Sequence, residues 1–92
     1  ATAQAVGNRL AKLAQKVQIL LVTHSPQVAA CGSHHFKVEK KTQNNITTTY
    51  VTELSEQERE EEIARMLAGE QISDEARAAA KVLIKSSSIR IE

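Results

Sequence analysis

A continuous apolar run, Ile19-Leu20-Leu21-Val22, restricts the possible folds of this 92-residue chain more than any other segment. A short run of this kind is typical of a strand buried on both faces, as in a parallel sheet flanked by helices. The run ends at His24-Ser25-Pro26, where proline pre-sets the first turn of a helix and Ser25 can cap it. We therefore predict a buried strand over Gln18–Thr23 and a short helix over Pro26–Ala30.

A helix is predicted ahead of this strand. Apolar residues recur there at spacings of three and four, which is the helical period, and Thr2 can cap the helix. These residues are Ala3, Val6, Leu10, Leu13 and Val17. Because the chain begins inside this pattern, we expect Ala1 to be a cut in a longer protein.

Two strands are predicted after the short helix. Residues His35–Lys41 and Ile46–Leu54 alternate apolar with polar or charged side chains, which suits half-exposed strands. Thr42–Asn45 join them, and Asn44-Asn45 tolerate the positive φ of a tight turn. We expect an antiparallel hairpin with one face in solvent.

Two helices are predicted to follow the hairpin. Ser55-Glu56-Gln57-Glu58 matches a capping box and starts a helix over 56–68, with Ile63, Met66 and Leu67 on its apolar side. Ser73 caps a last helix over 73–85. The expected buried stripe of that helix is Ile72, Ala76, Ala79, Ala80 and Leu83. Residues 86–92 are expected to be a frayed tail.

The composition excludes several classes of protein. With one Phe, one Tyr and no Trp, the chain cannot be a reader that stacks nucleic-acid bases on aromatic rings. A single cysteine, Cys31, excludes an internal disulfide and a four-cysteine zinc site, and it favours a reduced, cytoplasmic compartment. No apolar run reaches the ~18 residues that span a bilayer, so we expect no membrane partner.

His24 is the candidate functional residue. It follows the predicted buried strand directly, and open α/β sheets bind ligands at the carboxyl ends of their strands. A histidine in this place can exchange hydrogen bonds with an anionic ligand. Position alone leaves a second interpretation open, in which His24 merely caps the strand.

Four segments of the chain resemble one known family in collinear order. Val22–Ala30 resembles the switch-histidine segment of the RecN family of bacterial DNA repair proteins, in the SMC-like branch of the ABC ATPases. Ala1–Gly7 resembles the helix after that family's D-loop, and His34–Lys40 resembles its next strand. Glu62–Arg77 contains matches to its carboxyl-terminal helices, although Ser25 stands where the family often has leucine.

This resemblance implies an α/β fold that is the C-terminal part of a P-loop NTPase head, covering residues 1–85. It makes His24 the catalytic and nucleotide-binding residue, in contact with the γ-phosphate of ATP. The implied cofactors, ATP and Mg²⁺, belong to the intact protein, because the three glycines form no phosphate-binding loop and no G-K-[ST] occurs. We therefore expect no ATPase activity from this chain alone. The implied partners are the remainder of the head, the second head of a homodimer and DNA.

Other constellations leave alternatives. Cys31, His34 and His35 could ligate a metal, but neighbouring strand residues point to opposite faces, and we expect no metal site. His24-Ser25 lacks the G-x-S-x-G turn of a hydrolase. The remaining alternative is a small interaction or DNA-binding module without ATP chemistry.

The uneven distribution of charge along the chain is the feature that such a module could use to bind a partner. Residues 1–50 contain six cationic side chains and one acidic side chain, whereas residues 51–92 contain six cationic and ten acidic side chains. Lys37, Lys40 and Lys41 on the hairpin could contact DNA phosphates, or they could simply keep an exposed strand from aggregating. Helices 56–68 and 73–85 imitate a helix-turn-helix, but the second begins with Asp74 and Glu75, which suit base edges poorly.

Overall fold

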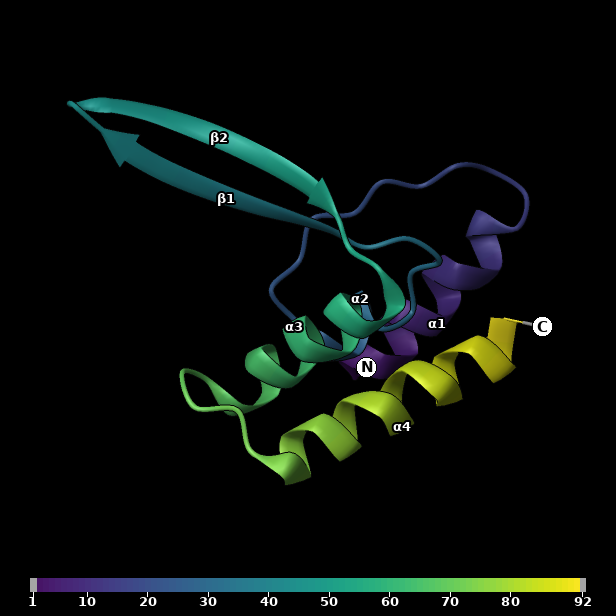
Figure 1. The fold of residues 1–92 in the computed structure, drawn as a ribbon. Coiled ribbons are helices and arrows are strands. Elements are labelled where there is room, and N and C mark those ends of the chain that lie inside the picture. The colour runs from purple at the N-terminus through teal and green to yellow at the C-terminus, as the bar shows by residue number, and fades with distance from the viewer. Residues whose placement is uncertain (1, 92) are drawn as a thin grey trace.

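The structure is a computed structural model that describes residues 2–91. Its helices are α1 (Ala3–Ala14), α2 (Pro26–Ala29), α3 (Glu56–Ala68) and α4 (Asp74–Ile91), and its strands are β1 (Phe36–Gln43) and β2 (Ile46–Glu53). Figure 1 shows the four helices gathered together, with the β1–β2 hairpin projecting away from them. The mixed α/β character predicted from the sequence is confirmed.

The predicted buried strand over Gln18–Thr23 is wrong. This segment is irregular in structure, and the Leu20 and Val22 side chains are 86% and 90% exposed. The described residues form one sheet, and it contains β1 and β2 alone. A strand needs neighbours to satisfy its main-chain groups and cover its faces, and this segment has none among residues 2–91.

The core lies between the helices and is small. Ala30, Ile63, Ala64 and Ala80 are buried at its centre, and Ile63 is 0% exposed. Partly buried apolar residues pack around them: Ala29, Met66, Ile72, Ala76, Leu83 and Ile84. Most of the stripe expected on α4 is therefore confirmed, but Ala79 is exposed and Ile84 packs instead.

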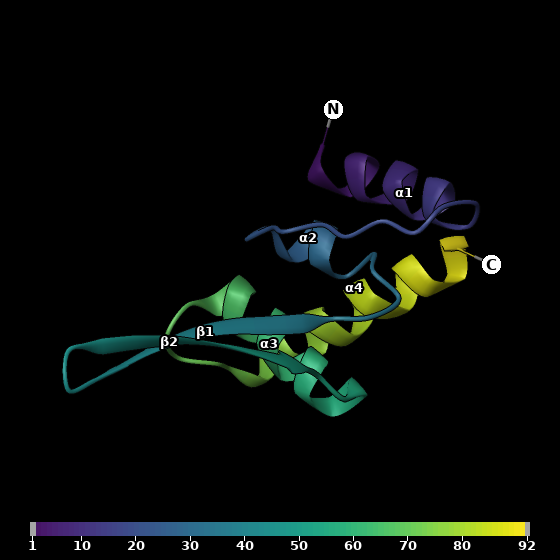
Figure 2. The ribbon, with the colours of Figure 1, turned by 90° about the horizontal axis from the view of Figure 1, so that it is seen from above.

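Helix α1 buries a different face from the one expected. Its N-cap is Thr2 as predicted, with Thr2 Oγ1 accepting a hydrogen bond from Ala5 N at 3.1 Å. Gly7 is its one buried residue, however, while Val6 and Leu13 of the expected stripe are exposed. Figure 2 shows α1 on the outer side of α2, and α1 packs against both α2 and α4. The periodic apolar face of α1 nevertheless remains open.

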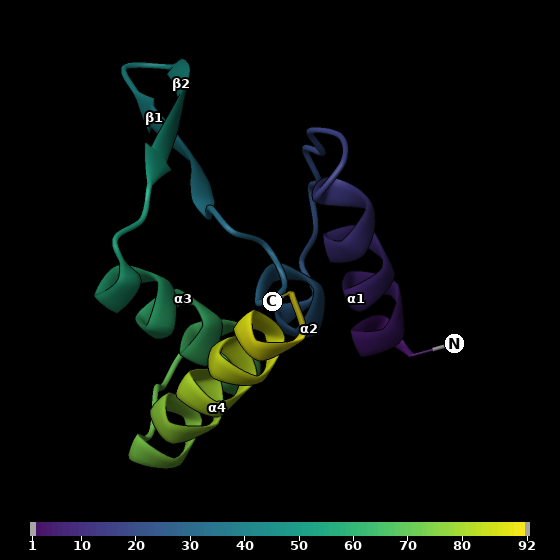
Figure 3. The same ribbon diagram turned by 90° about the vertical axis from the view of Figure 1, so that its right-hand side faces the viewer.

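The hairpin forms with a two-residue turn. Gln43 pairs with Ile46, and Asn44 and Asn45 between them have φ values of 52° and 63°. These positive values are those of a type I′ turn, whose twist matches the strands. The expectation of a single solvent face is wrong: Phe36, Val38 and Val51 are exposed on the more apolar face too. Figure 3 gives the reason, because most of the hairpin projects beyond the helices.

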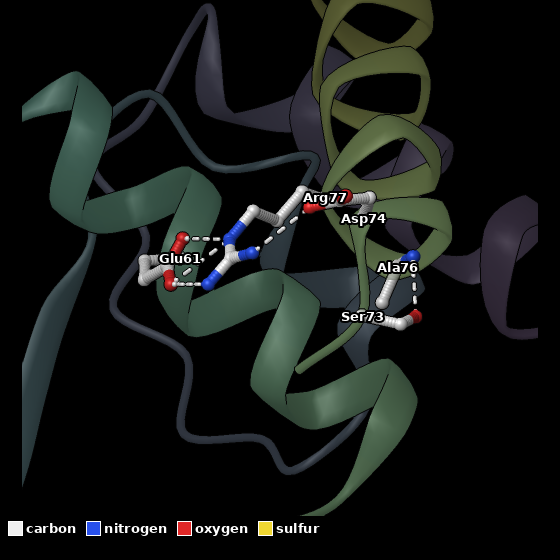
Figure 4. A network of polar contacts seen from close by, with 5 residues as sticks. All are labelled: Glu61, Ser73, Asp74, Ala76 and Arg77. Carbon is white, nitrogen blue, oxygen red and sulfur yellow. Dashed lines mark hydrogen bonds and ion pairs between the residues drawn. The ribbon is translucent and has the colours of Figure 1, made fainter. Parts of the chain in front are cut away.

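Helices α3 and α4 begin at the predicted caps. Ser55 Oγ accepts a hydrogen bond from Glu58 N, and Glu58 Oε1 accepts one from Ser55 N at 2.9 Å, which completes the capping box. Ser73 Oγ accepts one from Ala76 N at 3.1 Å (Figure 4). Arg77 donates across the two helices to Glu61 of α3, and within α4 it donates to Asp74 (Figure 4). These contacts hold the start of α4 against the middle of α3.

The last helix is longer than predicted. Helix α4 continues through Lys85 to Ile91. The expectation of a frayed tail over 86–92 stays a prediction, and residue 92 lies outside the described residues. Ser87 is buried, and its hydroxyl donates to Leu83 O at 2.9 Å. That bond removes the cost of placing a polar side chain in the core.

Candidate functional site around His24

His24 lies on the surface, directly before the start of α2. Its side chain is exposed. The backbone on its carboxyl side is fixed, because Ser25 N donates to Thr23 Oγ1 at 3.0 Å and Ser25 Oγ caps α2 by accepting from Val28 N at 3.4 Å. Pro26 occupies the first turn, as predicted. The His24 imidazole is thus accessible to a ligand. The backbone that carries it leads directly into α2, which sets the direction of the chain at this point.

Helix α2 is held by close packing against α1. A Cβ atom added at Gly7 would lie 2.7 Å from Cys31 Sγ and 3.4 Å from Val28 Cα. The first distance is shorter than a real Cβ contact, so a side chain at this position would force Cys31 to shift, and glycine favours the close approach. The end of α2 also enters the core, since Ala30 and Cys31 are 2% and 5% exposed.

Helix α3 holds the carboxyl end of α2 through Arg59. Its Nη2 atom donates to Ala29 O at 3.1 Å, to Ala30 O at 2.9 Å and to Gly32 O. The last carbonyls of a helix have no partners within it, and a cation there also meets the negative end of the helix dipole. Burial lowers the pKa of Arg59 from its ordinary value, yet the group stays charged at neutral pH.

The three residues considered as metal ligands have separate roles. Cys31 Sγ is buried beside Asn8 Oδ1 and Ser87 Oγ, each at 3.6 Å. His34 Nδ1 lies 3.0 Å from Glu53 Oε2 at the base of the hairpin. Within residues 2–91, no three His, Cys, Asp or Glu side chains come together as a metal would require.

His35 is the histidine that the fold covers. Its Nδ1 is buried and has no hydrogen-bond partner among the described residues. Burial lowers the pKa of His35 below its ordinary value, and the nearby Arg59 charge lowers it further. His35 directly precedes β1, and its side chain is partly covered.

The hairpin lysines lie on two faces, as strand alternation predicts. Lys37 Nζ is 3.4 Å from Glu62 Oε1, which ties the hairpin to α3. Lys41 Nζ lies 5.2 Å from the centre of the Tyr50 ring, a cation–π distance. Lys40 is exposed on the opposite face. A contact between these lysines and DNA stays a prediction.

Sequence reasoning missed Arg59 and Gly7. Arg59 lies in a run of glutamates and has the pattern of a solvent-exposed cation, so no local signal marks it. Gly7 carried a weak signal, since a glycine inside an apolar helical pattern often marks a close approach. The Ser25 hydroxyl, which follows His24 in the sequence, caps α2 and donates to Gln27 Oε1 at 3.2 Å.

Comparison with known proteins gives a consistent result. No model of a protein family matches the chain. DNA repair protein RecN of Xylella fastidiosa (strain 9a5c) is 49% identical over 85 residues, which is 92% of this chain and 15% of that protein. RecN of Vibrio cholerae is 45% identical over 90% of this chain and 15% of its own length, and RecN of Bacillus subtilis is 40% identical over 92% and 15%.

The chain spans about 15% of the length of these curated relatives, and the part it matches is C-terminal. In the described part of the chain, no helix has both the length and the apolar character needed to cross a membrane. The collinear match across nine-tenths of the chain agrees with the resemblance found in the sequence. The chain belongs to the RecN family, as a counterpart of a C-terminal segment of its members.

Proposed function

We propose that this chain is the switch-histidine segment of an ATPase head in a DNA repair protein that acts on double-strand breaks and in recombination. The observation that supports it most is the position of His24, exposed directly before a capped and anchored helix. The relatives are named as DNA repair proteins, which supplies the cellular role. ATP hydrolysis itself is inferred from the resemblance of Val22–Ala30 to the switch-histidine segment.

The chemistry proposed for His24 is positioning. Phosphoryl transfer depends on holding the γ-phosphate and the attacking water in line and on stabilising charge on the phosphate oxygens. An imidazole can donate a hydrogen bond to such an oxygen or orient the water. His24 would do this at the surface where α2 begins.

The rest of the nucleotide site must come from elsewhere in a full-length protein. The sequence has no Gly-rich phosphate loop, and residues 2–91 offer no cluster of three ligands for Mg²⁺. Mg²⁺ would neutralise charge between the β- and γ-phosphates when it is bound. We therefore propose that this chain contributes His24 to a composite site and does not turn over ATP alone.

Exposed apolar surface supports the view that the chain works within a larger head. Leu20 and Val22 are almost fully exposed, and Val17 and Leu13, which precede them in the chain, are about half exposed, at 51% and 52%. Where several large apolar side chains are exposed, an interface is the usual reason. We propose that the remaining part of the head covers it, with a second head and DNA as further partners of the intact protein.

The proposal is tested by exchange into a relative. The matching segment of Vibrio cholerae RecN is replaced by this chain, and survival of double-strand breaks is measured in cells that lack their own RecN. A chimera that supports survival should lose this ability when it carries His24→Ala and keep it with His34→Ala, the matched control. Survival with His24→Ala equal to that of the unsubstituted chimera would contradict the proposal.

A further inference from the structure

Helix α2 is too short to hold its own shape. It contains four residues, and isolated helices shorter than ~12 residues are marginal in water. Its amino end is capped by Ser25 and Pro26, which lie next to His24. Its carboxyl end depends on groups from other elements, because the last carbonyls have no partners inside the helix.

Arg59 supplies those groups from a distant part of the chain. A single guanidinium nitrogen, Nη2, contacts the carbonyls of Ala29, Ala30 and Gly32, which lie 27 to 30 residues earlier. The Arg59 Nε atom is buried without a partner. Among the ion pairs formed by residues 2–91, none includes Arg59. The Arg59 side chain therefore bonds the carbonyls at the end of α2 and not one of the nearby glutamates.

This contact is mechanically connected to His24. The helix between them is one turn long and hydrogen-bonded throughout, from Ala29 N to Ser25 O and from Ala30 N to Pro26 O, both at 3.0 Å. A tilt at its carboxyl end therefore moves Ser25 and the residue before it. Misplacement of a catalytic group by about 1 Å can reduce a rate by about 100-fold.

We propose that Arg59 is a positioning residue for His24: it fixes the carboxyl end of α2 and thereby the place of the His24 imidazole at the γ-phosphate. This inference rests on the proposed function of His24. It assigns a role in ATP turnover to a side chain of α3 that itself touches no nucleotide.

The test uses the full-length protein that carries this segment. Single-turnover hydrolysis of radiolabelled ATP is measured for Arg59→Ala, Arg59→Lys, His24→Ala and the double variant His24→Ala/Arg59→Ala, and nucleotide affinity is measured separately. Arg65→Ala is the matched control, because Arg65 is on the same helix but pairs with Glu62 and not with α2. Hydrogen exchange of the α2 amides reports the local effect of each change.

The proposal expects Arg59→Ala to lower the hydrolysis rate by about 10- to 100-fold while nucleotide affinity changes less than about threefold. Lysine can donate to the same carbonyls, so Arg59→Lys should recover most of the rate. The α2 amides should exchange faster in Arg59→Ala, and Arg65→Ala should match the unsubstituted protein. In the His24→Ala background, Arg59→Ala should cause almost no further loss.

Two results overturn the positioning role alone: an unchanged rate in Arg59→Ala while His24→Ala is impaired, or a loss of equal size in both backgrounds. The second result would mean that Arg59 stabilises the protein generally. An unchanged rate in His24→Ala would instead overturn the proposed function, and the positioning role with it.

Discussion

Gly7 decides how closely α1 can approach α2. It is the one buried residue of α1, and its missing side chain leaves room for Cys31, whose thiol in turn lies near Asn8, Ser87 and Gln27 O. The thiol therefore fills a junction of three helices. The packing of α1 against α2 thus depends on the absent side chain of Gly7 and on the Cys31 thiol, which a hydropathy pattern does not reveal.

The first prediction concerns Gly7→Ala. Alanine favours a helix over glycine by about 1 kcal/mol, but a Cβ 2.7 Å from Cys31 Sγ forces overpacking that costs about 1–3 kcal/mol. We expect a lower free energy of unfolding in urea for Gly7→Ala. Cys31→Ala should restore stability in the Gly7→Ala background, because it removes the clashing sulfur. A Gly7→Ala variant more stable than the original chain would contradict the packing described for α1 and α2.

At the scale of the elements, the sequence predicted the features that depend on neighbouring residues in the chain, namely the helix caps and the hairpin turn. The caps at Thr2, Ser25, Ser55 and Ser73 and the turn at Asn44-Asn45 all form where the sequence placed them. The strand over Gln18–Thr23 did not form, because its stability depends on neighbouring strands that a pattern cannot supply. Arg59 escaped prediction for a related reason, since its acceptors are carbonyls of a different helix.

The second prediction concerns the hairpin turn. Asn44 and Asn45 both have positive φ, which costs a residue with a Cβ about 1–2 kcal/mol when its side chain cannot compensate. Asn45→Val should therefore weaken the hairpin, whereas Asn45→Gly should keep or strengthen it. Amide exchange in β1 and β2 measures the difference. Equal protection of the strands in both variants would show that the turn does not set this pairing.

At the scale of the whole molecule, the core is small, and many large apolar side chains are exposed. The exposed set comes from α1, from the segment after it and from the hairpin, and includes Leu13, Val17, Leu20, Val22 and Val38. The sequence marked several of these residues as buried. Their exposure follows from the absence of covering elements among the described residues, and it agrees with a chain that spans about 15% of its relatives' length.

The third prediction is that the purified chain self-associates. Leu20 and Val22 lie exposed on an irregular segment, and exposed apolar side chains favour contact between copies. Light scattering across a concentration series should show mass increasing with concentration. Leu20→Ser/Val22→Ser should reduce this increase, whereas Val82→Ser, a change of another exposed apolar residue, should not. A monomer at high concentration would contradict this account of the surface.

The measurement that tests the role of His24 most directly is the steady-state ATP turnover of the full-length protein with and without His24→Ala. Loss of a group that acts on the transferring phosphate should lower kcat by about 100-fold or more and leave nucleotide affinity largely unchanged. His34→Ala, which removes an exposed histidine paired with Glu53, should keep full turnover. An unchanged kcat in His24→Ala would make this histidine a structural cap and would contradict the proposed ATPase role.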